Sequence, residues 1–275
     1  MTPTEYFDRD GYWITPDPIF SKTEIDRFRK SIQGVMDKNY ESGRRPMAGR
    51  NFPRMTDPQG LIQISNIWWT GGAIRELTLD ARLGKLATEL LGCEGVVLWH
   101  DQLLNKPPLE EQDRKSGNVG FHQDWDYWQV CDQPDIVTAS VALVDVDRHN
   151  GAMMMAPGSH NWGCMGFKVG DLAVQENTKR IHDPDGRQAE LAYCEMPAGS
   201  VSFHHCKTLH GSGPNRTNSP RICMSIHYLG EHVRYDASRG ASHTNLQIDP
   251  RNDGDLFRGE QHPVVYSRDT ASTSG

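Results

Sequence analysis

The sequence has no long hydrophobic run, no recognisable targeting segment and no internal repeat. No apolar stretch in the 275 residues approaches the roughly 18 residues that a membrane-spanning helix needs. The N-terminal residues MTPTEYFDRDGYW lack the basic and apolar regions of a signal peptide, and the C-terminal STSG is not a peroxisomal address. These absences predict a cytoplasmic protein that does not enter a membrane.

Closely spaced cysteines and an excess of positive charge are also missing. The six cysteines form no Cys-x-x-Cys pair, which argues against a thiolate zinc site or a redox dithiol and favours reduced, structural thiols. The net charge is −7 and the pI is about 5.9, which argues against a broad nucleic-acid surface. A local basic patch for an anionic small molecule remains compatible with this charge. The charge gives no indication of oligomeric state.

Two segments of the first third have helical periodicity. Residues 21–38 open with a capping box formed by Ser21 and Glu24, and their apolar residues recur on one face. A second helix is expected over residues 80–91, and Gly92 is a suitable stop.

Residues 39–60, between these two helices, are rich in Gly, Pro and Arg and predict a long loop. Ordered loops of this length are often functional. The arginines within residues 44–54 therefore allow two interpretations, a solvated basic loop or a contact with an anionic substrate. These arginines are Arg44, Arg45, Arg50 and Arg54.

The remaining sequence consists mainly of short β-type runs separated by turn signals, which predicts a mainly β sandwich or barrel with flanking helices. The runs are 94–104, 135–146, 151–160, 197–205 and 221–229. Residues 161–190 form a polar connection that we interpret as a candidate lid. No linker divides the chain, so we expect a single domain over residues 1–267, with its core at about 94–230. Residues 268–275 are expected to form a flexible tail.

The segment FHQDWDYWQV, residues 121–130, places one histidine and two acids among four aromatic residues. Alternate side chains of a β-strand face the same way, so we expect His122 and Asp124 on one face, where they can bind a metal together. Asp126 is expected to lie past the end of the strand. His210, just before a Gly-Ser-Gly-Pro turn, is the strongest candidate for a third ligand. Two histidines and one carboxylate form the facial triad of non-haem Fe(II) oxygenases, which leaves coordination positions open.

His-x-Asp alone is a weak signal in a chain with 12 histidines. Arg221 makes the pattern more specific, because a guanidinium fork suits the distal carboxylate of a 2-oxoglutarate co-substrate. Ser212 could add a hydroxyl to the same carboxylate. Two alternatives stay open: a cupin-type metalloenzyme that does not use 2-oxoglutarate, and a non-catalytic binding protein with the same fold. The cupin-type alternative assigns no role to Arg221, and the binding-protein alternative assigns no role to the metal ligands.

Several other histidines are interpreted as structural. His204 and His205 have no carboxylate at metal-ligand spacing, and His160 is expected to shape its Pro-Gly-Ser-His turn. His227 lies within the run 221–229, where core packing is favoured over a place in the site.

Three segments together resemble the phytanoyl-CoA dioxygenase family of Fe(II)/2-oxoglutarate oxygenases: FHQDWDYW, NGAMMMAPGSH and HGSGPNRTNSPRICMSIHYL. FDRDGY near the N-terminus and LLNKPP add to the resemblance, which covers most of residues 7–230. It implies a double-stranded β-helix, a cupin-like jelly roll. It also implies Fe(II), 2-oxoglutarate and O₂ as cofactors, with ascorbate as a candidate activator. The implied reaction is hydroxylation, or another oxidation, of an unactivated C–H of a small organic metabolite, with release of succinate and CO₂.

The resemblance assigns roles to the matching positions. It implies that His122, Asp124 and His210 bind iron, and that Arg221 and Ser212 bind the co-substrate. Further candidates for co-substrate contacts lie on the strands before and after the triad: Gln102, Lys106, Thr138 and Ser140.

The aromatic residues beside the triad are candidates for the wall of the substrate pocket, with core packing as the alternative. They are Trp125, Tyr127 and Trp128. No CoA-binding motif is present, so a free small-molecule metabolite is favoured over an acyl-CoA. The family includes hydroxylases of amino acids and of secondary metabolites, and the sequence does not choose among such substrates.

Overall fold

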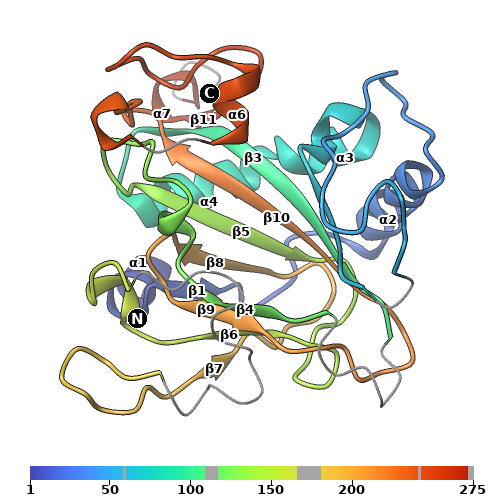
Figure 1. The fold of residues 1–275 in the computed structure, drawn as a ribbon, viewed down its shortest axis with the longest axis horizontal. Coiled ribbons are helices and arrows are strands. Elements are labelled where there is room, and N and C mark those ends of the chain that lie inside the picture. The colour runs from blue at the N-terminus through green and yellow to red at the C-terminus, as the bar shows by residue number, and fades with distance from the viewer. Residues whose placement is uncertain (58–59, 109–116, 166–180, 241–242, 272–275) are drawn as a thin grey trace.

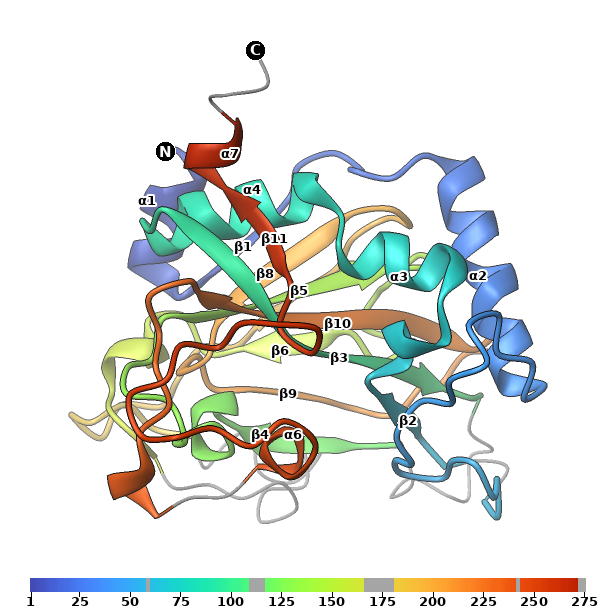
Figure 2. The same cartoon turned by 90° about the horizontal axis from the view of Figure 1, so that it is seen from above.

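Two antiparallel sheets dominate the computed structural model, which describes residues 1–57, 60–108, 117–165, 181–240 and 243–271 (Figure 1). The major sheet has the spatial order β1 (Tyr12–Ile14), β8 (Val201–His205), β5 (Ile136–Ala142), β10 (Arg221–Gly230), β3 (Gly95–Lys106) and β11 (Val264–Ser267), and β2 (Ile62–Ser65) pairs with another part of β3. The minor sheet has the order β4 (Val119–His122), β9 (His210–Ser212), β6 (Met153–Met155) and β7 (Ala192–Tyr193). Figure 2 shows α1, α3 and α4 on one side of the major sheet and the minor sheet on the other, where α6 lies beside β4.

The helix layer is formed by α1 (Pro3–Asp10), α2 (Lys22–Met36), α3 (Gly72–Thr78) and α4 (Ala81–Leu91). Shorter elements are α6 (Thr244–Ile248), α7 (Arg268–Ala271), η1 (Ile67–Thr70), η2 (Asp124–Asp126), η3 (Ser159–Asn161) and η5 (Ala237–Arg239). The mainly β architecture with flanking helices is therefore confirmed. Among the described helices, none is both long and apolar enough to cross a bilayer.

The two helices expected from periodicity are confirmed with their caps. Ser21 and Glu24 form the capping box of α2, in which the Ser21 side chain accepts the Glu24 backbone N–H. Asp80 caps the start of α4, and Gly92 ends it with φ 62°. Glycine adopts this left-handed conformation without the steric cost of a side chain.

The two faces of the major sheet differ in chemistry. On β10, the alternating residues 224, 226 and 228 are apolar or aromatic and pack in the core beneath the helices. Arg221, Ser225 and His227 point the other way and line the space between the sheets. Burial of the apolar face stabilises the fold, while the opposite face carries polar side chains.

A bulge in β3 sets which of its residues face that inner space. The pairing between β10 and β3 shifts after His227, so that Trp99 is an extra residue between the pairs His227–His100 and Tyr228–Leu98. The side-chain alternation reverses at this point.

On one side of the bulge, Val96 and Leu98 belong to the core beneath the helices. On the other side Leu103 does, and His100 and Gln102 face the inner space instead. A regular strand would have placed residues 98 and 100 on the same face.

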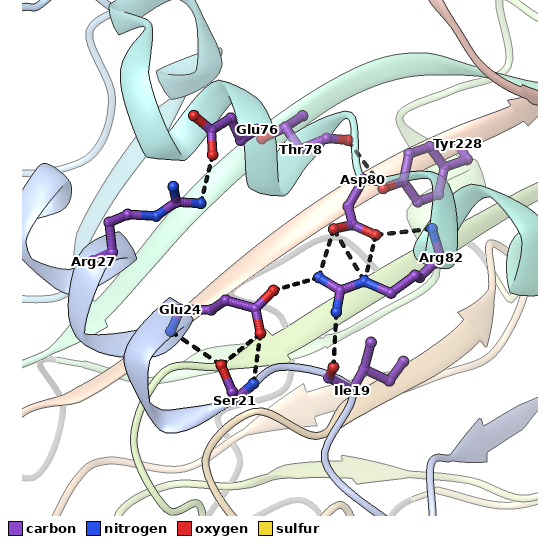
Figure 3. Close-up of polar contacts among 9 residues, drawn as sticks. All are labelled: Ile19, Ser21, Glu24, Arg27, Glu76, Thr78, Asp80, Arg82 and Tyr228. Carbon is purple, nitrogen blue, oxygen red and sulfur yellow. Dashed lines mark hydrogen bonds and ion pairs between the residues drawn. The ribbon is translucent and has the colours of Figure 1, made fainter.

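Polar contacts join the helices to one another and, through Tyr228, to the major sheet (Figure 3). Arg82, in the first turn of α4, donates to Asp80 at 2.8 Å and to Glu24 of α2 at 2.7 Å. The Arg82 guanidinium, with Ser21, lowers the pKa of Glu24 to about 2. The Tyr228 hydroxyl of β10 donates to the Thr78 carbonyl at the end of α3 at 3.1 Å. Exposed ion pairs contribute little to stability, so we assign these contacts mainly to the orientation of the helices.

Both ends of the described chain contribute strands to the major sheet, β1 near the N-terminus and β11 near the C-terminus. Residues 268–271, the start of the expected tail, form α7, and residues 272–275 lie outside the described residues. The candidate lid over residues 161–190 includes 166–180, which also lie outside the described residues.

Candidate metal centre

The structure brings His122, Asp124 and His210 together between the two sheets. One ligand atom from each lies within 4.8 Å of the other two, and all three residues are buried. His122 is the last residue of β4 and pairs directly with His210, the first residue of β9. Asp124 begins η2, and one residue separates it from the end of the strand.

The backbone reaches this arrangement by a different route from the regular strand that we expected. β4 ends at His122, and Gln123 turns away and donates to the Lys207 carbonyl at 2.6 Å. Asp124 then starts a 3₁₀ turn, and its Oδ1 lies 3.5 Å from His122 Nε2. Asp126 lies past the strand's end, as predicted, and lines the pocket.

Hydrogen bonds fix which nitrogen of each histidine is free to bind a metal. His122 Nδ1 lies 2.9 Å from the Gly120 carbonyl, and His210 Nδ1 lies 2.8 Å from the Thr208 carbonyl. A carbonyl only accepts, so each Nδ1 carries the proton and each Nε2 keeps a lone pair. Histidines that bind metals are commonly oriented by such a bond at the other nitrogen. The donor set therefore fits a divalent transition metal.

The two oxygens of Asp124 have different partners. Oδ1 faces the two Nε2 atoms, at 3.5 Å from His122 and 3.8 Å from His210. Oδ2 accepts from the Thr138 hydroxyl at 3.0 Å and lies 3.3 Å from His204 Nε2. Burial opposes ionisation, but His210, His122 and His204 outweigh it and hold the pKa of Asp124 well below its usual value. The carboxylate is therefore ionised, with one oxygen directed at the metal position.

The metal centre opens into a pocket of about 590 Å³. At one end of the pocket, Lys106 and Arg221 are paired across β3 and β10, and their exposures are only 1% and 3%. Lys106 Nζ donates to Ser212 Oγ at 2.6 Å, and Arg221 Nη2 donates to the Gly151 carbonyl at 2.7 Å. Burial and then the Arg221 charge lower the pKa of Lys106.

This cation pair, Lys106 with Arg221, has no carboxylate partner within the described residues. Arg221 Nε is buried and has no hydrogen-bond partner there. Buried charges are normally paired, because an uncompensated charge in a protein interior is costly. The cation pair is thus suited to an anionic ligand beside the metal.

The other candidate residues divide between the pocket wall and its surroundings. Gln102, Thr138, Tyr127 and Trp128 line the pocket. Ser140 is buried and pairs with Ser225 on the same sheet, but it is not part of the wall.

Trp125 also lies outside the pocket wall. It packs in a separate apolar cluster with Val130 and Cys206, and the Arg239 guanidinium lies 5.5 Å from its ring centre. Core packing, the alternative considered for this residue, describes its position.

The pocket lining also includes three residues that sequence reasoning interpreted otherwise or left undecided, Arg50, His204 and His227, and two histidines that it did not consider, His100 and His243. His227 was interpreted as core, although it shares side-chain parity with Arg221 and the period-two rule could have identified it. His204 was considered structural, yet it contacts Asp124. Arg50 alone of the four loop arginines lines the pocket.

Two facing antiparallel sheets that enclose a His-Asp-His cluster beside buried cations define a non-haem metal oxygenase of the cupin type. Sequence comparison gives the family. The model of the phytanoyl-CoA dioxygenase (PhyH) family matches residues 7–223, and the chain belongs to this family.

Individual relatives agree with this assignment. The peroxisomal phytanoyl-CoA dioxygenase of Rattus norvegicus is 31% identical over 158 residues, which are 55% of this chain and 44% of that protein. The ectoine dioxygenase of Sphingopyxis alaskensis is 31% identical over 237 residues, which are 81% of this chain and 73% of that protein. The crystal structure of EctD from S. alaskensis with 2-oxoglutarate and 5-hydroxyectoine superposes with a TM-score of 0.63 at 25% identity, and covers 85% of this chain and 77% of that one.

The family and the metal centre together confirm the class of enzyme that the resemblance implied. The protein is a non-haem Fe(II)- and 2-oxoglutarate-dependent dioxygenase with a cupin-like fold. A small-molecule substrate agrees with the relatives of this chain.

Proposed function

We propose that the protein hydroxylates, or otherwise oxidises, an unactivated C–H of a small, free organic metabolite, with release of succinate and CO₂. One observation carries this proposal: the cation pair of Lys106 and Arg221 lies buried in the pocket that holds the His-Asp-His cluster, and no carboxylate among the described residues pairs with it. A dicarboxylic keto acid fits both features, because one end can bind a metal and the other can bind the cations.

The proposed iron ligands are His122 Nε2, Asp124 Oδ1 and His210 Nε2. Iron(II), when bound there, supplies the chemistry that couples O₂ to oxidation of 2-oxoglutarate. The residues of this chain orient the three ligand atoms and exclude water, since all three side chains are buried and two carbonyls fix the imidazoles. Ascorbate is proposed as an activator of the iron enzyme.

The distal carboxylate of 2-oxoglutarate is proposed to bind Arg221 and Lys106, with Ser212 Oγ beside them. Arg221 offers the unpartnered Nε, and Lys106 can exchange its bond to Ser212 for one to the co-substrate. Gln102 faces the same pocket and is a further proposed contact. Thr138 is proposed to orient Asp124, because the Thr138 hydroxyl donates its proton to Asp124 Oδ2. Ser140 is retained as a co-substrate candidate on the strand that carries Thr138.

Tyr127 and Trp128 are proposed as walls of the substrate site. The sequence has no CoA-binding motif, which favours a free metabolite, such as an intermediate of secondary metabolism, over an acyl-CoA. Arg50 at the pocket offers a cation for an acidic group of the substrate. We place the enzyme in the cytoplasm, and this placement is supported by the six cysteines, all of which are free thiols.

The test begins with anaerobic addition of Fe(II) and 2-oxoglutarate, which should produce a weak visible charge-transfer band. The band should disappear in Asp124→Ala, because the variant loses the anionic ligand. A band that persists undiminished in Asp124→Ala would contradict the assigned metal site. Succinate release over a panel of metabolites then identifies the substrate. A metal-dependent turnover without any succinate would favour the cupin-type alternative that does not use 2-oxoglutarate.

A further inference from the structure

A row of polar side chains crosses the inner face of the major sheet beyond the metal centre. The strand registers pair His100 of β3 with His227 of β10, His227 with Thr138 of β5, and Thr138 with His204 of β8. All four residues are buried and line the pocket. Lys106 lies six residues further along β3 from His100, which corresponds to roughly 20 Å of strand. The pocket therefore has a cationic end and an imidazole end.

Hydrogen bonds within this row determine where the proton of His227 lies. The Thr138 hydroxyl is 3.0 Å from Asp124 Oδ2 and 2.8 Å from His227 Nδ1. A carboxylate only accepts, so Thr138 donates its single proton to Asp124 and must accept from His227 Nδ1–H. Nε2 of the neutral His227 ring consequently carries a lone pair.

That lone pair has no partner within the described residues. His227 and His100 are each only 4% exposed, and Nε2 of both rings is buried and unpartnered. The two ring centres are 4.3 Å apart, and Trp128 packs edge-on against both, at 4.7 Å and 5.6 Å. Buried polar atoms of native proteins are generally satisfied, so an unsatisfied pair that lines a pocket indicates a missing ligand.

The next side chain of the imidazole end offers the complementary group. His243 caps α6, and its Nδ1 accepts the Asn245 backbone N–H at 3.2 Å. Nε2 of the neutral His243 ring therefore carries the proton. Its ring centre is 5.3 Å from that of His100. A ligand here meets a fixed acceptor on His227 and a fixed donor on His243.

We propose that the imidazole end, formed by His100, His227 and His243 beside Trp128, binds a hydrogen-bond donor group of the substrate, a hydroxyl or an amine. His227 Nε2 accepts the donated proton. This inference rests on the proposed function only in treating the bound molecule as the substrate to be oxidised. Any acidic group of that molecule is better placed near Arg50, because the cation pair is proposed to hold 2-oxoglutarate.

The charge state of the three rings supports this division of the pocket. Burial lowers the pKa of His227 to about 3 and that of His243 to about 4, and it holds the pKa of His100 well below its usual value. The imidazole end is therefore uncharged near neutral pH. A carboxylate placed there would meet uncharged imidazoles and would face the lone pair of His227.

The test uses enzyme loaded with Zn(II) in place of Fe(II), which is diamagnetic and does not activate O₂. Four ring compounds of similar size serve as probes: cyclohexanol, cyclohexylamine, methoxycyclohexane and cyclohexanecarboxylate. Dissociation constants are measured by ligand-observed NMR with and without 2-oxoglutarate, for the wild type, His227→Phe and the control His232→Phe. His232 lies on the surface and pairs with Asp135, outside the pocket.

We expect the alcohol and the amine to bind the wild type and to lose about tenfold in affinity in His227→Phe, as for one buried hydrogen bond. The ether and the carboxylate should bind more weakly than the donors and should not respond to this change. His232→Phe should behave as the wild type. Equal binding of the ether and the alcohol, or preference for the carboxylate, would overturn the inference.

A measurement on the wild type needs no variant to fold. The imidazole ¹⁵N shifts of ¹⁵N-histidine-labelled protein should show His227 protonated at Nδ1 and not at Nε2. The opposite tautomer, or a charged ring, would overturn the donor specificity. Binding of 2-oxoglutarate is measured on the same samples, so the proposed function and this inference can be contradicted independently. Loss of 2-oxoglutarate binding contradicts the proposed function, whereas loss of donor preference alone contradicts only this inference.

Discussion

Replacement of Arg221 by alanine should separate co-substrate binding from metal binding. Arg221 is 3% exposed, its Nε has no partner within the described residues, and its Nη2 donates to the Gly151 carbonyl, which is not a proposed metal ligand. A buried hydrogen bond to a charged group contributes about 1.5–3 kcal/mol. This range corresponds to a rise of about tenfold to somewhat more than a hundredfold in the Kd of 2-oxoglutarate. The Kd of the metal should change by less than about threefold, which is roughly 0.6 kcal/mol.

The assay is an anaerobic titration of the Fe(II) enzyme with 2-oxoglutarate, followed by the visible charge-transfer band. A separate calorimetric titration measures metal affinity. Arg221→Lys serves as the matched variant, because it keeps the charge but loses the planar fork, and it should fall between wild type and Arg221→Ala. Equal loss of metal and co-substrate affinity would show that Arg221 supports the fold instead. An unchanged 2-oxoglutarate affinity would refute the assignment of the cation pair.

Three other perturbations test the site and its scaffold. Lys106→Met should raise the Kd of 2-oxoglutarate by about tenfold in the same titration, while the metal affinity stays unchanged. Burial raises the pKa of Asp101 from 3.8 to about 7, so the folded state keeps a proton that the unfolded state has released, and stability falls as pH rises across this window. Urea unfolding of Asp101→Asn should lack that slope, and an unchanged slope would place its origin elsewhere. Saturation with metal at about 100 times its Kd should stabilise the wild type by about 2.7 kcal/mol, reversibly by chelation, and should not stabilise Asp124→Ala.

The elements that the sequence predicted well are those with local signals. α2 and α4 were predictable because each has a side-chain N-cap and apolar residues at helical spacing. α3 was not, because it begins at Gly71 and Gly72 without a side-chain cap. β2 and β11 are four-residue strands that depend on pairing with distant parts of β3, and no local pattern encodes that pairing.

For the site, the spacing of His122 and Asp124 was informative although the assumed strand was wrong. The observed backbone, a strand that ends at His122 and a 3₁₀ turn that begins at Asp124, brings the two side chains together. The His-x-Asp spacing was therefore informative although the strand is shorter than expected. The position of His100 in the pocket could not be predicted from the sequence, because the bulge at Trp99 reverses the side-chain alternation of β3. His243 lies outside the predicted core and reaches the pocket only through the tertiary fold.

The two charged clusters of the pocket are each incomplete without a ligand. Asp124 is an ionised carboxylate among histidines, and Lys106 with Arg221 is a buried cation pair without a counter-ion within the described residues. At the proposed sites, a divalent metal would compensate the first cluster and a dianionic co-substrate would compensate the second. Each ligand should therefore stabilise the fold if it binds the native state alone, and the free energy of unfolding should increase with the concentrations of metal and 2-oxoglutarate. The imidazole end carries no net charge. A neutral donor group that binds there should therefore increase the free energy of unfolding less than the metal or 2-oxoglutarate does. Selectivity at that end should depend on hydrogen bonding.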